Sequence, residues 1–350
     1  MVKLGIFVFA NNSGLGNQTR RLTEMLSPDV IMAIDSSPFS KNKEQHFEWY
    51  DNFTGYKVTG FPNNREIDVF LKGLTHVIVC ENPLNNYLLD AAKDRGVKVI
   101  IQSNYEFCDH LDKDLTLPHK FLMPSYWHVD TMKEKFGDDR VVYLPPPIHP
   151  QEFSEARDVN LHREAQGRPK FLHIVGTLAA EDRNGTLDLI AAVELSEADY
   201  DITIRSQIEL PEEYMSLSKK INYSFQDLKD PQDLYKNYDA LILPRRYGGL
   251  SLTTNEALMS GLPVLMSDMS PNNKLLPKEW LFPSEKRGEL FTRVLLDVHE
   301  SPVEELAKKI DWIARRSEEE LSTMKVNAFD LAINNFSSDL LRDKYKALLI

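Results

Sequence analysis

Short apolar runs alternate with amphipathic stretches along the first part of the chain. The runs are uniformly apolar and rich in β-branched and aromatic residues, which is typical of strands buried on both faces of a parallel sheet. They predict strands at Leu4–Phe9, Val30–Ile34, His76–Cys80, Val97–Ile101, Phe121–Met123 and Val141–Leu144. The stretches between them predict helices, including Asn17–Leu26, Arg65–Leu74, Leu84–Arg95 and Tyr126–Phe136. This alternation predicts a doubly wound α/β domain.

Pro145-Pro146-Pro147 interrupts the pattern, and three prolines form a stiff extended segment that can join neither a helix nor a central strand. The pattern then restarts, with strands expected at Lys170–Val175, Asp201–Arg205, Ile221–Phe225, Ala240–Leu243 and Val264–Met266. Helices are expected at Thr186–Glu194, Asp230–Tyr238 and Leu252–Ser260, and from Val303 to the end. We therefore predict an N-terminal domain at 1–147, a second domain at 148–325, and a helical tail at 326–350 that packs back toward the first domain.

Composition and charge narrow the class of protein. The chain has 350 residues and a net charge of −12, of which residues 1–150 contribute −3 and residues 151–350 contribute −9. This acidity argues against non-specific binding of nucleic acid. No apolar run approaches the roughly 20 residues that a membrane span requires. Two cysteines, Cys80 and Cys108, cannot form a disulfide framework or a zinc site, so we expect a cytoplasmic protein. The oligomeric state is not indicated.

The turn after the first predicted strand contains Gly14 and Gly16 within Asn11–Asn17. Glycines there let the backbone approach a ligand, and a helix N-terminus offers unpaired N–H groups. A dinucleotide fingerprint would have a third glycine where Thr19 stands, although Asp35 ends the next strand as a ribose-binding acid would. We expect Gly14 and Gly16 to contribute to donor binding, with ordinary turn geometry as the alternative.

The most specific pattern is LPRRYGGLSLTTNEALMSGLPV at residues 243–264. It places a glycine-containing loop between a strand and a helix, with Glu256 one turn into that helix. Gly261 and Pro263 are explained by helix termination alone. Loop amides can bind sugar hydroxyls, however, and a carboxylate can accept hydrogen bonds from both hydroxyls of a ribose. The combination favours a site for a nucleotide that carries a sugar.

Glu-Ala-x-x-x-Gly-x-Pro-Val at 256–264, after this loop and a strand ending in Leu243-Pro244, resembles the donor signature of GT-B glycosyltransferases, most closely the large retaining group called family four. Weaker similarities are Val175-Gly176-Thr177, Asp182–Gly185, Tyr238–Ala240 and Tyr143-Leu144-Pro145. The resemblance implies two Rossmann-like domains facing across a cleft, and hexosyl or pentosyl transfer with retention. It implies a nucleotide-diphosphate sugar of UDP or GDP type as co-substrate, and no further cofactor. It assigns the ribose to Glu256 and the remaining donor contacts to Gly176, Gly248, Gly249, Leu250, Ser251 and Leu252.

The chain departs from the family pattern at three positions. The family's first Glu, eight residues before Glu256, is Gly248 here, and its diphosphate-binding Arg and Lys fall at Thr177 and Asn184. Because a departing diphosphate accumulates negative charge, cations are still required. The available replacements are Arg183, Arg205, Arg245 and Arg246, of which we expect Arg183 and Arg246 to act in catalysis. Neighbouring residues of an extended segment point to opposite sides, so one of Arg245 and Arg246 should reach the phosphates. No metal site is expected.

Polar residues also follow the first domain's strand at Val97–Ile101. Glu106 and His110 stand in this segment and could position an acceptor hydroxyl or take its proton. The family commonly has a histidine near Asn104, which is missing here. The alternative is that His110 only decorates a short helix. Glu81, after the preceding strand, is a similar but weaker candidate.

We predict a glycosyltransferase that moves a sugar from a nucleotide-diphosphate sugar to an acceptor hydroxyl. One alternative is a nucleotide-sugar epimerase of the same fold, although the donor helix offers only Glu256 as an acid or base. Another is a non-catalytic nucleotide-sugar-binding module, which the three departures favour. The Arg-Arg-Tyr-Gly-Gly loop is also similar to that of phage-encoded enzymes, some of which glycosylate hydroxymethylated bases in their own DNA. Modified DNA in a host cytoplasm is therefore one acceptor to test, although the only obvious basic cluster is Arg20, Arg21, Lys41 and Lys43.

Overall fold

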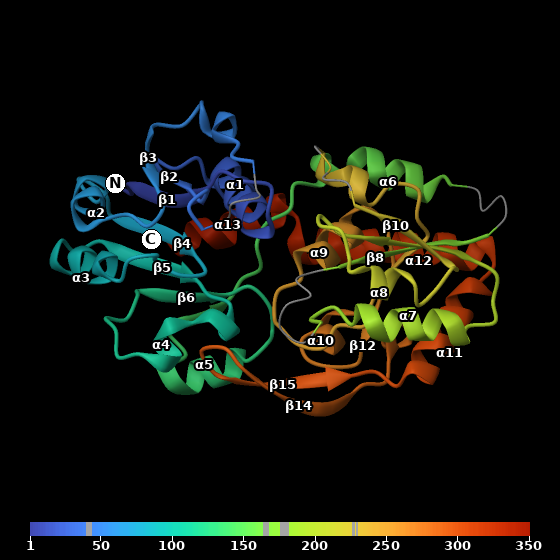
Figure 1. Ribbon diagram of the computed structural model, residues 1–350. Helices are drawn as coiled ribbons and strands as arrows, with labels where there is room; N and C mark the ends of the chain where they lie inside the picture. The colour runs from blue at the N-terminus through green and yellow to red at the C-terminus, as the bar shows by residue number, and fades with distance from the viewer. Residues whose placement is uncertain (40–43, 164–167, 176–181, 226–227, 229) are drawn as a thin grey trace. The chain divides into compact units, whose positions relative to one another are not determined.

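The chain passes from one unit to a second directly after the triple proline (Figure 1). The computed structural model describes residues 1–39, 44–163, 168–175, 182–225, 228 and 230–350. Unit 1 comprises Met1–Pro147, Thr292–Val294 and Phe336–Ile350, and unit 2 comprises Ile148–Phe291 and Leu295–Asn335. The predicted tail is thus divided, since residues up to Asn335 belong to unit 2 and the remainder to unit 1.

Unit 1 contains a seven-stranded parallel sheet in the order β3-β2-β1-β4-β5-β6-β7. Its strands are β1 (Leu4–Phe9), β2 (Val30–Asp35), β3 (Gly55–Thr59), β4 (His76–Cys80), β5 (Lys98–Gln102), β6 (Lys120–Met123) and β7 (Val141–Tyr143). Its helices are α1 (Gly14–Leu26), α2 (Asn64–Phe70), α3 (Tyr87–Asp94), α4 (Asp109–Asp112), α5 (Val129–Phe136) and α13 (Ser338–Ala347), with 3-10 turns η1 (Phe47–Tyr50) and η2 (Tyr105–Phe107).

The strands of unit 1 are apolar on both faces because each face has its own core. In β1, Phe7 and Phe9 pack into one cluster, whereas Ile6 and Val8 pack into the other. This explains why the run is uniformly apolar. The apolar pattern did not predict strand β3, because this strand lies at the sheet edge and Val58 is its only buried residue.

Helix α13 completes the second core of unit 1. Leu341 and Tyr345 are both buried in that cluster. The Tyr345 hydroxyl donates to the Pro145 carbonyl at 3.0 Å and accepts from Gln102 Nε2 at 3.1 Å. Burial raises the pKa of Tyr345 well above its usual value, so the phenol stays protonated. The C-terminal helix is therefore bonded to the proline segment and to the end of β5.

Tyr345→Phe is expected to lower the free energy of unfolding of unit 1 by about 1–3 kcal/mol, because the buried Pro145 carbonyl and Gln102 amide each lose a partner. Chemical denaturation followed by circular dichroism measures this change. Leu340→Ala on the exposed side of the same helix is the control and should change stability little. Equal losses in the two variants would contradict the role given to the hydroxyl.

Unit 2 contains a six-stranded parallel sheet in the order β10-β9-β8-β11-β12-β13 and an antiparallel hairpin, β14–β15. Its strands are β8 (Lys170–Ile174), β9 (Asp201–Arg205), β10 (Ile221–Ser224), β11 (Ala240–Leu243), β12 (Val264–Ser267), β13 (Leu281–Phe282), β14 (Glu285–Phe291) and β15 (Leu295–Glu300). Its helices are α6 (Ser154–Leu161), α7 (Thr186–Leu195), α8 (Glu212–Met215), α9 (Leu252–Met259), α10 (Asn272–Leu275), α11 (Val303–Ala314) and α12 (Glu318–Phe336), with 3-10 turns η3 (Pro150–Phe153), η4 (Pro231–Leu234) and η5 (Lys278–Trp280).

The predicted fold class, two doubly wound α/β domains with a helical C-terminal region, is confirmed. The helix expected at Asp230–Tyr238 is wrong, because the segment forms only the 3-10 turn η4. Asn237 adopts a left-handed conformation (φ 67°) and its N–H bonds the Asn160 side chain at 2.9 Å. That turn redirects the chain into β11 and leaves no room for a longer helix.

Candidate functional site

The strand order of unit 2 marks one place in its sheet for a ligand. Strand β8 lies between β9 and β11, so the chain leaves it toward one edge of the sheet and later returns to its other side. In open parallel sheets, ligands bind beyond the carboxyl ends of the strands at such a reversal. The segments that leave β8 and β11 at this end lead into α7 and α9, and they contain most of the predicted donor-binding residues.

Arg245 shapes the loop after β11. Its side chain is buried, with only 3% of the residue exposed. Its Nε donates to the Tyr247 carbonyl at 3.0 Å and its Nη2 to the Leu250 carbonyl at 2.8 Å. Ser251 then caps α9, since its Oγ accepts from Thr254 N at 3.4 Å. Arg245 thus determines the conformation of residues 247–250, because two of its N–H groups donate hydrogen bonds to carbonyls of this segment.

Gly248 has a structural reason to be glycine. Its φ is +106°, a conformation that side chains disfavour. A Cβ there would lie 2.2 Å from Arg183 Nη2 and 2.7 Å from Arg245 Nη2. The guanidinium of Arg183 also lies 5.4 Å from the centre of the Tyr247 ring. Two cationic groups therefore occupy the space where the resembling family has a glutamate, which accounts for that departure.

Arg246 points to a different set of partners. Its backbone N–H donates to the Arg183 carbonyl at 2.9 Å, and its carbonyl accepts from His299 N at 2.8 Å. Its Nε donates to the His299 carbonyl at 3.3 Å, and its Nη2 lies 3.9 Å from a Glu300 carboxylate oxygen. The end of β15 therefore holds this arginine beside the segment that begins α7. The sequence analysis missed His299 and Glu300 because they lie more than fifty positions along the chain.

Arg205 ends β9 next to β8, where its carbonyl accepts from Val175 N at 2.8 Å. Its Nε and Nη1 are buried, and neither has a hydrogen-bond partner among the described residues. The arginine thus lies at the carboxyl end of the sheet, and its Nε and Nη1 groups are the donors that a ligand there could use. The predicted donor residue Gly176 lies outside the described residues, as does Thr177.

Glu256 lies on α9 and is 6% exposed. Its Oε2 accepts a hydrogen bond from the Tyr235 hydroxyl at 2.7 Å, and Tyr235 is fully buried. The tyrosine orients the carboxylate, and nothing in the sequence pattern indicated this partner, because Tyr235 directly follows η4 and does not belong to α9. The glutamate is thus held in one position on the helix that follows the glycine loop.

In unit 1, the turn after β1 itself requires glycine at one of the two predicted positions, Gly16. A Cβ at Gly16 would lie 1.8 Å from the Asn11 carbonyl oxygen, so only glycine fits. The Gly16 N–H donates to the Ser13 side chain at 3.1 Å. A Cβ at Gly14, by contrast, would meet no atom within 4 Å. The close approach at Gly16 is therefore between two segments of this chain, and it explains that glycine without a ligand.

Glu106 and His110 are both buried, with 1% and 5% of each residue exposed. His110 Nε2 donates to the Thr116 carbonyl at 3.1 Å, and its ring packs edge-on against Phe121. Burial lowers the pKa of His110, so the imidazole is neutral at pH 7. The imidazole has the contacts of a core residue, and neither side chain offers an open surface to an acceptor in this structure.

Glu81 is more exposed than these two and follows β4 at the strand-order reversal of unit 1. It has a left-handed φ of 68°, which is unusual for glutamate, and its Oε1 accepts from Asn104 Nδ2 at 3.2 Å. Strained non-glycine residues cluster at functional sites. Glu81, the weaker candidate from the sequence, is therefore better placed than Glu106 and His110 to contact an acceptor.

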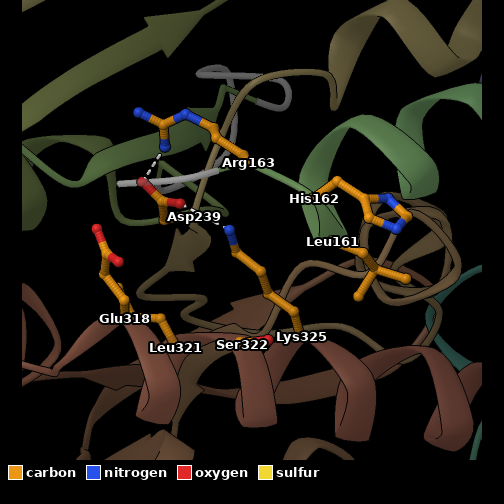
Figure 2. A pocket seen from close by; sticks show the side chains of 8 residues that line it. All are labelled: Leu161, His162, Arg163, Asp239, Glu318, Leu321, Ser322 and Lys325. Carbon is orange, nitrogen blue, oxygen red and sulfur yellow. Dashed lines mark hydrogen bonds and ion pairs between the residues drawn. The ribbon is translucent and has the colours of Figure 1, made fainter. Parts of the chain in front are cut away.

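A cavity of about 180 Å³ lies at the opposite end of the unit 2 sheet (Figure 2). Asp239, just before β11, is 1% exposed and bonds both Arg163 and Lys325; the Lys325 contact is 2.8 Å. Lys325 Nζ also donates to the Asn160 carbonyl at 2.9 Å, and Lys170 N donates to Asp239 at 2.8 Å. These buried charges satisfy one another, so the cluster joins α12 to the sheet and is not a second candidate site.

Residues 169–313 match the family model described as "Glycosyl transferases group 1". The match covers the loop after β11, Glu256 and the four arginines Arg183, Arg205, Arg245 and Arg246. Among curated proteins, none matches the sequence of this chain. Within the described residues, no helix is both long and apolar enough to cross a membrane.

Solved structures resemble the chain over nearly its whole length. A glycosyltransferase from Rickettsia africae is 15% identical, with a TM-score of 0.70 over 99% of this chain and 97% of that one. HepE from Anabaena, solved with UDP and glucose, is 10% identical, with a TM-score of 0.70 over 100% and 99%. Sucrose-phosphate synthase from Thermosynechococcus elongatus is 13% identical, with a TM-score of 0.68 over 99% and 98%. At these identities the likeness shows the fold, which is GT-B.

Proposed function

We propose that the chain transfers a sugar from a nucleotide-diphosphate sugar to an acceptor hydroxyl, with the donor bound by unit 2, because residues 169–313 match the model of group 1 glycosyl transferases and the chain has a GT-B fold. The observation that carries this proposal is the placement of Arg183. Its Nη2 would lie 2.2 Å from a Cβ at Gly248, and its carbonyl accepts from the Arg246 N–H at 2.9 Å. The UDP complexes of HepE support a UDP-type donor.

The arginines take the place of the cations that the resembling family uses for the diphosphate. Arg183 and Arg246 belong to adjacent segments, and the Arg246 N–H donates a hydrogen bond to the Arg183 carbonyl at 2.9 Å. Arg205 brings unpartnered guanidinium donors on the neighbouring strand. Since Arg245 donates hydrogen bonds to the Tyr247 and Leu250 carbonyls, its role is to hold the loop in the conformation that receives the donor. Fixed cations in a site shielded from water stabilise the negative charge that develops on the leaving diphosphate.

The remaining donor contacts fall on the loop and on α9. Residues 248–252 present backbone amides to the transferred sugar and Glu256 accepts hydrogen bonds from the ribose, as the resemblance implies. Tyr235 keeps the carboxylate in position for this task. We further propose retention of configuration, and catalysis without a metal ion, because the arginines supply the required positive charge.

We assign the acceptor surface to unit 1, where Glu81 and Asn104 follow adjacent strands. A DNA acceptor would need exposed cations on this unit. Arg21 is fully buried, Arg20 pairs with Glu24 at 3.2 Å, and Lys41 and Lys43 lie outside the described residues. The described part of that basic cluster does not favour DNA, so the acceptor proposed is a hydroxyl compound of another kind.

Turnover of a panel of nucleotide sugars tests the proposal. The protein is incubated with UDP- and GDP-sugars, with and without chelator, and with a panel of hydroxyl acceptors that includes hydroxymethylated DNA. Release of nucleotide diphosphate, unchanged by chelator, is expected. Binding of a donor without any release would favour a binding module, and an isomerised sugar would favour an epimerase.

Glu256→Gln is expected to weaken binding of the nucleotide diphosphate by about 1–3 kcal/mol, because an amide accepts fewer hydrogen bonds from the ribose than a carboxylate does. Isothermal titration calorimetry with UDP and GDP measures this change. The control is Glu304→Gln on the exposed start of α11. Affinity equal to that of the control would remove Glu256 from the donor site.

A further inference from the structure

Tyr105 and His128 form a stacked pair of rings in unit 1 that the donor-site assignment does not use. Their ring centres lie 4.0 Å apart, and their planes differ by 18°. Tyr105 packs against a core cluster of unit 1, and both residues remain partly exposed. The ring of Trp127 lies beside the pair, with its centre 4.8 Å from that of His128. The two rings thus provide a small aromatic surface that neighbouring side chains hold in place.

Three adjacent strands bring this pair next to a carboxylate and an amide. Glu81 follows β4, whereas Asn104 and Tyr105 follow β5. His128 lies between β6 and α5, and β6 pairs with β5. The Asn104 Nδ2 group donates to Glu81 Oε1 at 3.2 Å. We call these four residues the Glu81–His128 cluster. It lies at the carboxyl ends of parallel strands beside a strand-order reversal, which is where open sheets bind ligands.

The backbone of this cluster is strained at two of its four residues. Glu81 has a φ of 68° and His128 a φ of 53°, both in the left-handed region that residues other than glycine seldom adopt. In the part of the chain that the structure describes, six such residues have a positive φ, and two of them belong to this cluster. Strain of this kind is concentrated at ligand sites. The strain is an observation independent of the ring stacking, and it indicates the same place.

We propose that the Glu81–His128 cluster is the acceptor subsite and that the acceptor is a neutral saccharide. A sugar ring has a face of C–H groups, which packs against an aromatic ring, and hydroxyls at its edge, which bond to a carboxylate and an amide. The Glu81 carboxylate repels a phosphorylated acceptor. An alkyl alcohol would leave most of the polar groups of the cluster without partners. This inference rests on the proposed function and adds the chemical class of the acceptor.

Acceptor-dependent release of nucleotide diphosphate tests the class of acceptor. The protein is incubated with the nucleotide sugar that it binds most tightly, together with neutral mono- and disaccharides, the 6-phosphates of the same monosaccharides, or octanol. At least one neutral saccharide is expected to raise the release above the rate without acceptor, whereas the phosphates and octanol are not. Donor hydrolysis that no neutral saccharide stimulates would overturn this inference and leave the proposed function standing.

Two variants test the residues. His128→Leu removes the outer ring and Glu81→Gln the carboxylate, and each is expected to raise KM for the saccharide about tenfold. Affinity for UDP or GDP, measured by calorimetry, should stay at the wild-type value. The control is His119→Leu, because His119 is a partly exposed histidine directly before β6, at the amino end of the same sheet. A KM equal to that of the control in both variants would contradict the assignment.

Saturation-transfer NMR with the same saccharides, in the presence and absence of UDP, needs no turnover. The C–H groups on one face of the sugar should receive the strongest saturation from the protein, and His128→Leu should weaken this signal. If the wild-type protein released no nucleotide diphosphate from any donor, the proposed function would fail, and the NMR signal would still decide whether the cluster binds a saccharide. Absence of saccharide binding under both conditions would overturn the inference.

Discussion

Arg246→Ala and Arg183→Ala are each expected to lower kcat about 10²- to 10³-fold, the usual effect of removing one fixed group that stabilises developing negative charge. Both side chains belong to the segments that leave β8 and β11 at the strand-order reversal. The charge on the leaving diphosphate grows as the sugar departs, so the effect should fall more on kcat than on donor affinity.

Single-turnover release of nucleotide diphosphate measures this effect, with calorimetry as the measure of donor binding. Arg168→Ala is the matched control, since Arg168 is an exposed arginine before β8, at the amino end of the same sheet, and pairs with Asp199 at 2.9 Å. The control should retain the wild-type rate. Losses of similar size in all three variants would show that the phosphate site lies elsewhere.

Asp239→Ala is expected to lower the free energy of unfolding of unit 2 by about 3–5 kcal/mol, because breaking a buried ion pair leaves the partner charge uncompensated. Lys325, which is 3% exposed, would keep only the Asn160 carbonyl as its bonding partner in the cluster. The control is Glu318→Ala, an exposed residue that lines the same cavity (Figure 2). Replacing Lys325 by methionine as well should recover much of the loss.

The pH dependence of unfolding provides a second measure of this cluster. Burial alone would raise the pKa of Asp239, but Lys325 and the hydrogen bonds lower it below the ordinary value. A lowered pKa stabilises the fold at pH values above about 4, and this contribution disappears as pH falls through the folded-state pKa. Denaturation between pH 7 and pH 3 should therefore show a smaller loss of stability in Asp239→Ala than in the wild type. Parallel curves would contradict this account.

The parts of the fold that could be predicted are those in which burial dictates the sequence. Strand β1 has six buried residues, and its pattern predicted its bounds. Strand β14 has six exposed residues and one partly exposed residue, so no burial pattern could reveal it. Near η4, the left-handed Asn237 decides the path of the chain, and its conformation depends on Asn160, far away in sequence.

The same distinction applies to the candidate site. The loop after β11 and Glu256 could be found from residue types at fixed spacing, because one strand–loop–helix segment contains them all. Tyr235 and His299 could not be found in this way, since each acts through a tertiary contact with that segment. His110 illustrates the opposite case, in which a polar residue type suggested chemistry and the structure gives the ring a packing contact with Phe121.

A crystal structure of the protein with its nucleotide diphosphate would locate the donor site. We expect the diphosphate to lie against Arg183 and Arg246 beside Gly248, with the ribose hydroxyls bonded to Glu256. A diphosphate bound instead at the Gly14–Gly16 turn of unit 1, or at the Asp239 cavity, would contradict this expectation.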